Sequence, residues 1–360
     1  MGGPLNVGIV GLGRISGAYL RTFAALPQIE VTALADLDPA RAEAARAAAP
    51  GARALPVADL LAAPDVDLVL NLTVPAAHAE VAAAALAAGK HVYGEKPLAL
   101  DTAQARELLA AAGELRVGCA PDTVLGTGTQ TARKAVADGL IGRPVAANAV
   151  FVSPGHESWH PDPEFYYRPG GGPLLDMGPY YLSALVHLLG PVERVLGATS
   201  RSRPTRTIGS GPRAGTVFDV EVDTHVAGIL VHTSGAITTL VTSFDVVAST
   251  QPRIEVHGSA GSLAVPDPNG FDGEVRLRHP GEPDWTVLPP SAGYVGAARG
   301  AGVADLAAAL AEGRPHRASA DLALHVLDVM QTLLAAGRSG GAREVETACE
   351  VPQPVALAQL

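Results

Sequence analysis

The sequence predicts an α/β protein with two domains. We expect an N-terminal Rossmann domain with a doubly wound parallel sheet, then an α/β domain with a large, mostly antiparallel open sheet. Three observations lead there. The chain has 360 residues, more than one hydrophobic core normally organises. Short apolar runs alternate with helical stretches at first, and longer strand-like segments follow. We place the domains at residues 1–121 and 122–360, with closing helices able to pack back on the first.

The first third of the chain shows the strand–helix alternation of a parallel sheet that is covered on both faces. Its apolar runs are nearly continuous, as in strands buried on both sides. We expect strands in segments 5–10, 29–36, 66–74, 90–97 and 116–121, and helices in segments 16–26, 39–49, 77–89 and 101–113.

Beyond this region the pattern changes to that of an antiparallel sheet. Several segments alternate polar with apolar residues and are separated by Gly, Pro and Asn turns. A helix over 128–142 is expected to lead into strands within 144–153, 221–232, 236–246, 252–265 and 274–279, and helices over 302–313 and 320–337 close the chain. Residues 200–215 are our candidate for a mobile loop.

Composition argues against several classes of partner. The formal charge is −10 and no basic run occurs, so we expect neither a nucleic-acid nor an anionic-membrane partner. Two distant cysteines, Cys119 and Cys349, suit a reducing cytoplasm better than a disulfide framework. The start lacks a signal peptide's basic region, and the alanine-rich run is far shorter than the ~20 apolar residues of a membrane span. We expect a cytoplasmic protein.

The segment NVGIVGLGRISGAYL has the pattern of a dinucleotide-binding loop between a strand and a helix. Gly11 would permit the tight turn, and Gly13 would let the backbone approach a pyrophosphate at the start of the helix. Ser16 replaces the third glycine of the pattern. Arg14 and Ile15 complete the predicted cofactor-binding loop. The alternative is a glycine-rich turn without a ligand.

Two further positions extend the predicted cofactor site. Asp36 ends the second strand, where a carboxylate holds the ribose hydroxyls and repels a 2′-phosphate, so we favour NAD over NADP. NADP remains an alternative, because Arg14 and Arg41 are close enough in sequence for either to face a phosphate. The loop after the third apolar strand would lie at the carboxyl edge of the sheet, where ligands bind. Its predicted cofactor residues are Thr73, Val74, Pro75 and His78.

Several motifs, taken in order, resemble the Gfo/Idh/MocA oxidoreductases. They are VGIVGLGRIS, ADLDPARA, LNLTVPAAH, GEKPLALD and GGGPLLDMGPYYLSALVHLLG, with IEVHGSAGSL and RPHRASADLALHVLDVM further on. The resemblance covers nearly the whole chain. It implies a Rossmann domain and a C-terminal open sheet whose exposed face often supports oligomers, so a homodimer or homotetramer is expected. Members oxidise a secondary alcohol of a sugar, cyclitol or related polyol with NAD(P), or reduce the ketone.

The resemblance also implies roles for individual residues. In this family the lysine of the EKP motif reaches substrate and nicotinamide, which puts Lys96 in the active site and Glu95 near the cofactor. The peptide before the motif's proline, here Pro97, is often cis. The later motif supplies Asp176 and, four residues on, Tyr180 in place of the usual histidine. Tyrosine also occurs there in branches that resemble glucose–fructose oxidoreductase and dihydrodiol dehydrogenase.

The predicted chemistry needs a hydride acceptor and a group that moves the hydroxyl proton. We expect residues 176–190 to form a helix with Asp176 at its start and Pro179 in its first turn, which places Asp176 and Tyr180 on one face. A phenol with a pKa near ~10 is a poor base, but an ammonium ~4 Å away favours phenolate by roughly 4 kcal/mol, against a desolvation cost. Tyr180 is thus a candidate acid/base, with Asp176 orienting substrate and Lys96. The alternative is that Lys96 is the base.

Residues 153–173 form our candidate substrate loop, because they concentrate aromatic side chains in a chain that is only 4% aromatic. The alternative is an interface or packing loop. The substrate candidates are His156, Trp159, His160 and Tyr167, together with Asp122 after the last Rossmann strand. His156 and His160 have helical metal spacing, but prolines break the segment and we predict no metal.

The predicted function is therefore an NAD(P)-dependent dehydrogenase or reductase acting on a small sugar-like substrate. Two alternatives stay open. One is a glycosidase or lyase that uses bound NAD for transient oxidation. The other is a non-catalytic nucleotide-binding regulator, against which the presence of Lys96, Asp176 and Tyr180 argues.

Overall fold

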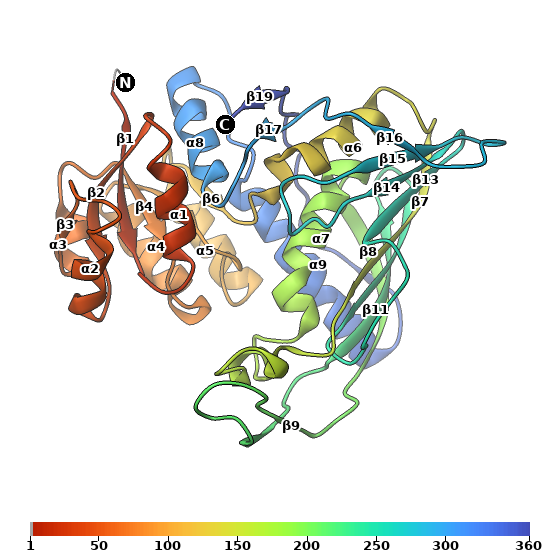
Figure 1. The fold of residues 1–360 in the computed structure, drawn as a ribbon, viewed down its shortest axis with the longest axis horizontal. Helices are drawn as coiled ribbons and strands as arrows, with labels where there is room; N and C mark the ends of the chain where they lie inside the picture. Colours follow the sequence, from red (N-terminus) through yellow and green to blue (C-terminus); the bar gives the residue numbers. More distant parts are fainter. Residues whose placement is uncertain (1–2) are drawn as a thin grey trace. The chain divides into compact units, whose positions relative to one another are not determined.

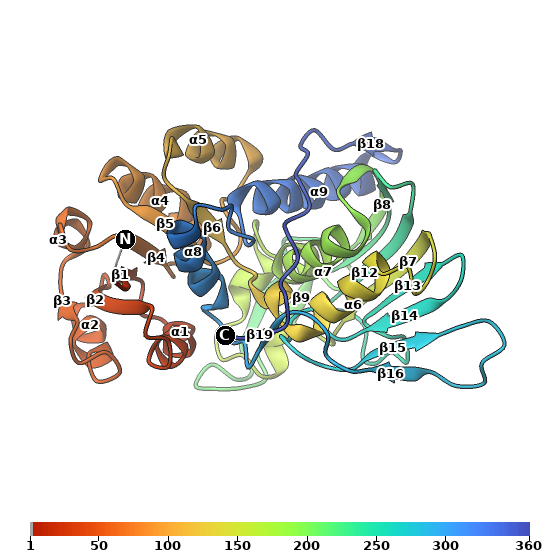
Figure 2. The same ribbon diagram turned by 90° about the horizontal axis from the view of Figure 1, so that it is seen from above.

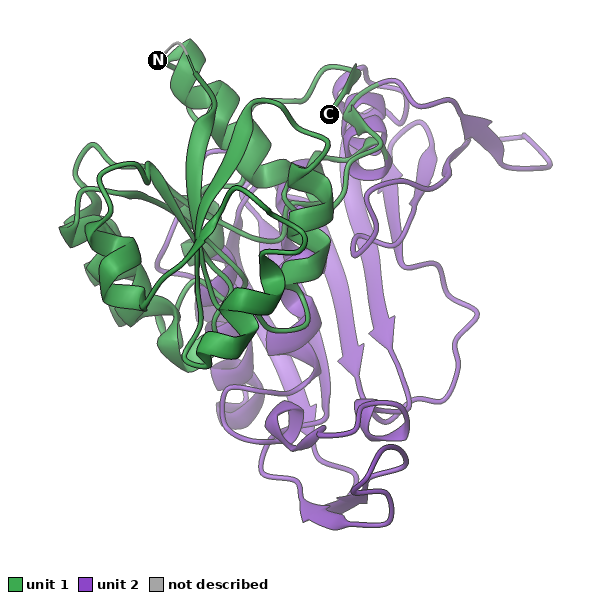
Figure 3. Ribbon diagram, turned by 60° about the vertical axis from the view of Figure 1, so that its left-hand side comes forward, with its two compact units in different colours: residues 1–127, 292–324, 352–360 green, residues 128–291, 325–351 purple. Residues whose placement is uncertain are grey.

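The computed structural model describes residues 3–360 and divides into two compact units (Figure 3). Unit 1 holds the chain up to Thr127 with residues 292–324 and 352–360, and unit 2 holds residues 128–291 and 325–351. Unit 1 thus runs past the predicted boundary at residue 121 and takes in two later segments. The division of the chain into autonomous domains stays a prediction.

Unit 1 contains a parallel sheet of six strands in the order β3-β2-β1-β4-β5-β6. The order reverses between β1 and β4, and ligands of open α/β sheets bind beside such a reversal, at the carboxyl ends of the strands. Figure 2 shows α1 and α2 on one side of this sheet and α4 and α5 on the other. The strands are β1 (Leu5–Val10), β2 (Ile29–Ala35), β3 (Arg53–Ala54), β4 (Leu68–Asn71), β5 (His91–Gly94) and β6 (Val117–Cys119), and the helices are α1 (Ser16–Phe23), α2 (Pro39–Ala45), α3 (Val57–Ala62), α4 (His78–Ala87) and α5 (Thr102–Ala112).

The burial of these strands confirms the parallel sheet that the apolar runs predicted. Every residue of β4 is buried, as expected of a central strand with helices on both faces. The predicted strand over 66–74 is shorter in the structure, because β4 ends at Asn71. The residues after Asn71 form a loop at the carboxyl edge instead.

The core of unit 1 needs a helix from near the end of the chain. Helix α8 (Ala301–Glu312) brings Val303 and Leu306 into the same buried cluster as Tyr19 and Phe23 of α1. The last residues also belong here: β19 (Ala358–Gln359) pairs in parallel with β17 (Tyr294–Val295).

Unit 2 is built on a sheet of nine strands in the order β16-β15-β14-β13-β7-β12-β11-β8-β18. Only β7 and β12 pair in parallel among these described strands, so the predicted large, mostly antiparallel sheet is confirmed. The strands are β7 (Pro144–Val152), β8 (Val192–Ser200), β11 (His225–His232), β12 (Ile237–Ser243), β13 (Ile254–Gly258), β14 (Ser262–Val265), β15 (Val275–Arg278), β16 (Thr286–Leu288) and β18 (Arg343–Glu344).

Helices cover one face of this sheet, as Figure 1 shows for α7 (Pro173–Leu189) and the later part of α9 (Ala320–Ser339). Helix α6 (Thr127–Ala137) belongs to this unit from Gly128 on. Helix α9 is long and apolar enough to cross a membrane by length and composition, but more than half of it is buried inside the chain. That burial is typical of a core helix.

Two predictions about unit 2 need correction. Helix α7 begins at Pro173, not at Asp176, because Pro is favoured at the first helical position, so Pro179 lies in the interior. The loop predicted to be mobile, residues 200–215, contains β9 (Thr205–Thr207), which pairs with β10 (Val217–Asp219). The ordering side chain is Arg206, which is only 4% exposed.

Candidate active site

The glycine loop of unit 1 connects β1 to α1 at the carboxyl edge of the sheet. Gly11 has a φ of 92°, and a Cβ there would lie 2.7 Å from the backbone of Leu72, so the fold itself requires glycine. Gly13 is exposed, and no atom lies within 4 Å of where its Cβ would be. The Ser16 hydroxyl donates to the Gly13 carbonyl at 2.7 Å, which closes the loop. Gly13 thus leaves open space that fits a pyrophosphate.

Asp36 lies beside this loop with a half-buried carboxylate. Its Oδ2 accepts a hydrogen bond from the Leu12 amide at 2.7 Å, and its Oδ1 accepts one from the Asp38 amide at 2.9 Å. The carboxylate is held in place and keeps lone pairs for ribose hydroxyls. Arg14 is exposed, and Ile15 is half-buried at the start of α1. The residues present therefore fit the adenosine and pyrophosphate parts of NAD.

The loop after β4 is held by a buried histidine. Thr73 is half-buried, Val74 is 67% exposed and Pro75 is exposed, so this edge is open to a ligand. The His78 ring nitrogens lie 2.6 Å from the Pro97 carbonyl oxygen and 3.0 Å from the Thr73 carbonyl oxygen. His78 is only 3% exposed. The structure therefore revises its predicted role: His78 ties the loop after β4 to the Lys96–Pro97 loop rather than facing the cofactor.

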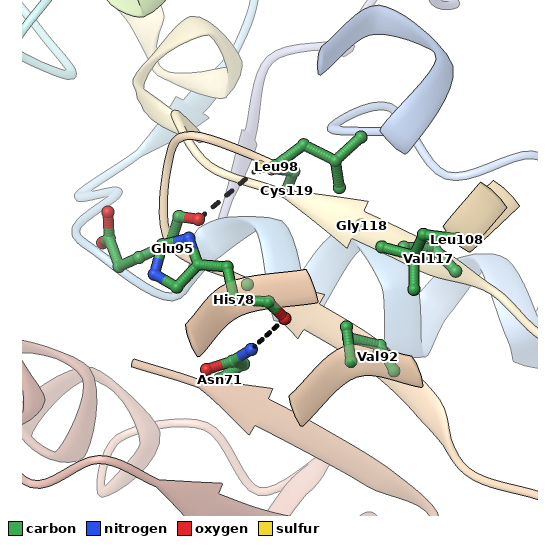
Figure 4. Close-up of a pocket in the computed structure, with 11 residues that line it drawn as sticks. Asn71, His78, Val92, Glu95, Leu98, Leu108, Val117, Gly118 and Cys119 are labelled. Atoms are coloured by element: carbon green, nitrogen blue, oxygen red, sulfur yellow. Dashed lines mark hydrogen bonds between the residues drawn. The ribbon is translucent and has the colours of Figure 1, made fainter. Parts of the chain in front are cut away.

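The EKP motif follows β5, and its Lys96–Pro97 peptide is cis, as the resemblance implies. The buried Tyr19 hydroxyl donates to Glu95 Oε1 at 2.8 Å, and Glu95 Oε2 accepts from the Lys96 amide at 3.2 Å. Burial, together with the nearby Glu95 carboxylate, raises the pKa of Tyr19, so its hydroxyl remains a donor. Figure 4 shows Glu95 and His78 around the same small cavity. The half-buried Lys96 is thus carried by a loop whose neighbours are fixed.

The structure gives Asp122 a part that differs from substrate binding. Its side chain is fully buried, and Oδ2 accepts hydrogen bonds from the Gly300 amide at 2.8 Å and the Gly302 amide at 3.1 Å. Arg299 lies 3.7 Å from Oδ1. Burial raises the pKa of Asp122, and Arg299 opposes that shift. Asp122 therefore holds the start of α8 in place. Its buried carboxylate is not accessible to a substrate in this structure.

Unit 2 provides the second group of candidates, on the first two turns of α7. Gly172, with a φ of 95°, precedes the helix, and its carbonyl accepts a hydrogen bond from the Asp176 amide at 3.0 Å. Asp176 lies in the first helical turn, where the helix dipole favours a carboxylate. Tyr180 follows one turn later on the same face and is 8% exposed. The structure thus keeps the predicted Asp–Tyr pair together.

Asp176 has a specific partner, His156, from the substrate loop. His156 Nε2 lies 2.9 Å from Asp176 Oδ2, and both side chains are more than four-fifths buried. The imidazole packs against Phe244 at 4.7 Å and against Tyr166 at 4.2 Å between ring centres. The structure therefore assigns His156 to holding a catalytic candidate, a role that the sequence did not predict.

The other substrate-loop candidates separate into exposed and buried residues. Trp159 is 52% exposed and His160 is half-buried, so both are open to a ligand. Tyr167 is fully buried, and its hydroxyl donates to Glu157 and accepts from the His156 amide. Burial, reinforced by the bond to Glu157, raises the pKa of Tyr167. The substrate role predicted for Tyr167 is wrong for this structure, because its hydroxyl is committed to the loop itself.

A buried arginine supports this loop from the β9–β10 hairpin. Arg206 bonds Glu157 Oε1 at 2.5 Å, contacts the Asp245 carboxylate, and donates to the Pro154 carbonyl at 3.0 Å. Its guanidinium also lies 5.3 Å from the centre of the Tyr167 ring. Sequence reasoning missed this network. The signal for it in the sequence was the arginine itself, flanked by two threonines in a strand-like TRT segment.

No group of three or more His, Cys, Asp and Glu side chains gathers as a metal site within residues 3–360. His156, one of the two spaced histidines, is engaged by Asp176 instead.

Two protein-family profiles match this chain, one within each unit. Residues 5–122 match the family profile described as oxidoreductase family, NAD-binding Rossmann fold, and residues 129–264 match the GFO/IDH/MocA C-terminal domain. The chain is 31% identical to a dTDP-3,4-didehydro-2,6-dideoxy-alpha-D-glucose 3-reductase of Streptomyces antibioticus, over 82% of this chain and 87% of that protein.

Two further similarities extend this finding. A 1,5-anhydro-D-fructose reductase of Ensifer adhaerens is 33% identical over 58% of this chain and 59% of that protein, so the match spans less than two thirds of that relative. Among solved structures, an NAD binding oxidoreductase from Klebsiella pneumoniae superposes with a TM-score of 0.81 at 25% identity, covering 95% of this chain and 99% of that one.

Proposed function

Because the chain belongs to the Gfo/Idh/MocA oxidoreductase family, we propose that it transfers hydride between NAD and a secondary alcohol or ketone of a sugar, cyclitol or related polyol. The observation that carries this proposal is the Asp176 carboxylate, held at 2.9 Å by His156 one helical turn before Tyr180. A fixed carboxylate beside a phenol is suited to binding a hydroxyl and moving its proton.

Bound NAD would supply the hydride acceptor. The chain's own residues would hold it: the Gly11–Ser16 loop at the pyrophosphate and Asp36 at the adenosine ribose. A carboxylate at Asp36 repels a 2′-phosphate, so NAD is preferred over NADP.

We assign the transfer of the substrate's hydroxyl proton to Tyr180. Lys96 is the cation proposed to favour the phenolate form of Tyr180, and Asp176 is the group proposed to orient the reacting hydroxyl. Lys96 acting as the base itself is the alternative. Glu95, fixed by Tyr19 at 2.8 Å, would keep the Lys96 loop in place.

The substrate class follows from the family and from the loop over Asp176. The two curated relatives are named for reduction of an anhydro sugar and of a nucleotide-linked keto sugar. A sugar-like substrate is therefore proposed for this chain too.

Self-association through the open sheet of unit 2 is proposed as well. Its uncovered side carries apolar pairs: Ile229 lies opposite Leu196, and Ile237 lies opposite Val231. Ile229 is 43% exposed and Ile237 is 48% exposed, so a second copy that covers them would remove apolar surface from water.

The test is a screen of polyols, inositols, aldoses and keto sugars with NAD, NADP and their reduced forms, followed by NADH fluorescence. We expect turnover in the presence of NAD, lost in Lys96→Ala while NAD binding survives. Lys134→Ala is the matched control, because Lys134 is a half-exposed surface lysine paired with Asp138. Wild-type turnover in Lys96→Ala would overturn the site assignment. Tightly retained NAD without net NADH would favour the glycosidase or lyase, and silence with no bound nucleotide would favour the regulator.

A further inference from the structure

Two large aromatic side chains of the substrate loop are mostly exposed. Trp159 is 52% exposed and Phe165 is 55% exposed, whereas Tyr167 and Phe244 beneath them are fully buried. Exposing indole and phenyl rings costs free energy unless another surface covers them, so a pair of them in one short loop indicates a binding surface.

The exposed rings are continuous with the side chain that holds Asp176. The His156 ring lies 5.3 Å from Trp159 and 4.2 Å from Tyr166, and Tyr166 lies 4.0 Å from Phe165, between ring centres. His156 itself contacts Asp176 at 2.9 Å. A ligand group bound at Asp176 therefore has an aromatic surface next to it within unit 2.

Hydrogen bonds and ion pairs fix the loop that carries this aromatic surface. The Glu157 carbonyl accepts from the Gly209 amide at 2.7 Å, and its carboxylate bonds Arg206. Arg213 bonds Asp162 at 2.5 Å from the same hairpin. A fixed loop loses little conformational entropy when a ligand stacks on it, so the rings are already arranged for binding.

Local charge indicates that the ligand is neutral. The cations that contact the loop are each paired: Arg206 with Glu157, Arg213 with Asp162 and Glu164, and Arg168 with Glu164. A phosphate needs a cation whose charge is not already balanced. The apolar face of a sugar ring needs only the aromatic surface.

We propose that Trp159 and Phe165 form a stacking subsite for a second, uncharged pyranose ring of the substrate, next to the ring whose hydroxyl binds Asp176. This deepens the proposed function and rests on it. The substrate class that fits is a neutral disaccharide or glycoside, rather than a nucleotide-linked sugar.

The experiment uses tryptophan fluorescence of the full-length protein. The chain has only Trp159 and Trp285, so Trp285→Phe leaves Trp159 as the reporter. We expect cellobiose or maltose to change its emission at millimolar concentration, and sorbitol to leave it unchanged. Phe165→Ala should weaken that binding on the order of tenfold. Size-exclusion chromatography of Trp159→Ala and circular dichroism of both loop variants accompany the titrations.

Three results would overturn the subsite: no response to either disaccharide, a response to dTDP-glucose alone, or loss of an oligomer in Trp159→Ala. The last would show that the rings form a subunit contact. The response also separates this proposal from the proposed function. A disaccharide response without turnover of any substrate supports the subsite and counts against the enzyme. With turnover, Trp159→Ala should raise KM for the disaccharide on the order of tenfold, with a smaller change in kcat.

Discussion

The candidate residues of unit 1 and those of unit 2 are held by different means. In unit 1 the glycine loop is shaped around its backbone: Gly11 packs on the Leu72 peptide, and Asp36 bonds the Leu12 amide. In unit 2 the catalytic candidate Asp176 is held by a side chain, His156, whose loop depends on the buried Arg206. Geometry that the backbone sets is encoded by a short sequence motif. Geometry set by side chains depends on contacts between distant segments.

The largest effect on stability is expected at Gly11, in the glycine loop of unit 1. Gly11→Ala adds a Cβ at 2.7 Å from the Leu72 backbone in a left-handed conformation, so we expect a loss of about 5 kcal/mol and little folded protein. Gly13→Ala is the matched control, since its Cβ meets open space. It should keep wild-type thermal unfolding and lose NAD affinity. Equal stability of the two variants would contradict the distinction.

The corresponding change in unit 2 is Arg206→Met. It leaves the Glu157 and Asp245 carboxylates without their buried cation, so we expect about 4 kcal/mol of destabilisation in urea unfolding. Arg213→Ala, at an exposed arginine of the same hairpin, should unfold close to wild type. If both variants behaved alike, the buried network would not support the loop.

Acid should destabilise the core of unit 2 through His232. Burial lowers the pKa of His232 to about 4, below the ordinary value of 6.5. Between these values the unfolded chain takes up a proton that the folded one excludes, so stability falls as pH drops from 6.5 towards 4. The contribution lost between ~pH 7 and ~pH 5 is about 2 kcal/mol. Urea unfolding of wild type against His232→Gln measures it, and an unchanged pH slope would contradict this origin.

The smallest effect is expected at His156, and it appears in turnover rather than stability. His156→Leu removes the hydrogen bond to Asp176, so kcat should fall about tenfold with less change in KM. His156→Gln keeps a donor and should recover most of the rate. Steady-state kinetics on the substrate found in the screen decide this. Equal losses in both variants would indicate that His156 touches substrate instead of positioning Asp176.

Local patterns were enough to predict much of the molecule. Both sheets, the turn at Gly11, the carboxylate at Asp36 and the joint placement of Asp176 and Tyr180 on one helix come from neighbouring residues or short spacings. The start of α7 was wrong by a few residues, because the Gly172 and Pro173 start signal was not used.

The rest depended on contacts that no local pattern encodes. Tyr19 and Glu95 are 76 positions apart, and Asp122 meets Gly300 across 178 positions. Tyr167 was predicted to face a sugar because of its residue type, yet packing buried it. Which polar side chains face a ligand and which are used inside the protein is decided by tertiary packing, so in both units the parts of the site that side chains hold were the less predictable ones.

The return of the chain's last residues to unit 1 has a consequence for synthesis. Arg317 donates to the carbonyls of Gln353 and Pro354 at 2.9 and 3.1 Å, and β19 pairs with β17. Tyr19 and Phe23 meanwhile share their core with α8. The ribosome has therefore to synthesise α8 and β19 before the first-made segment of unit 1 can finish folding. For the same reason, an excised nucleotide-binding fragment ending near residue 127 would carry exposed aromatic surface, because it lacks α8.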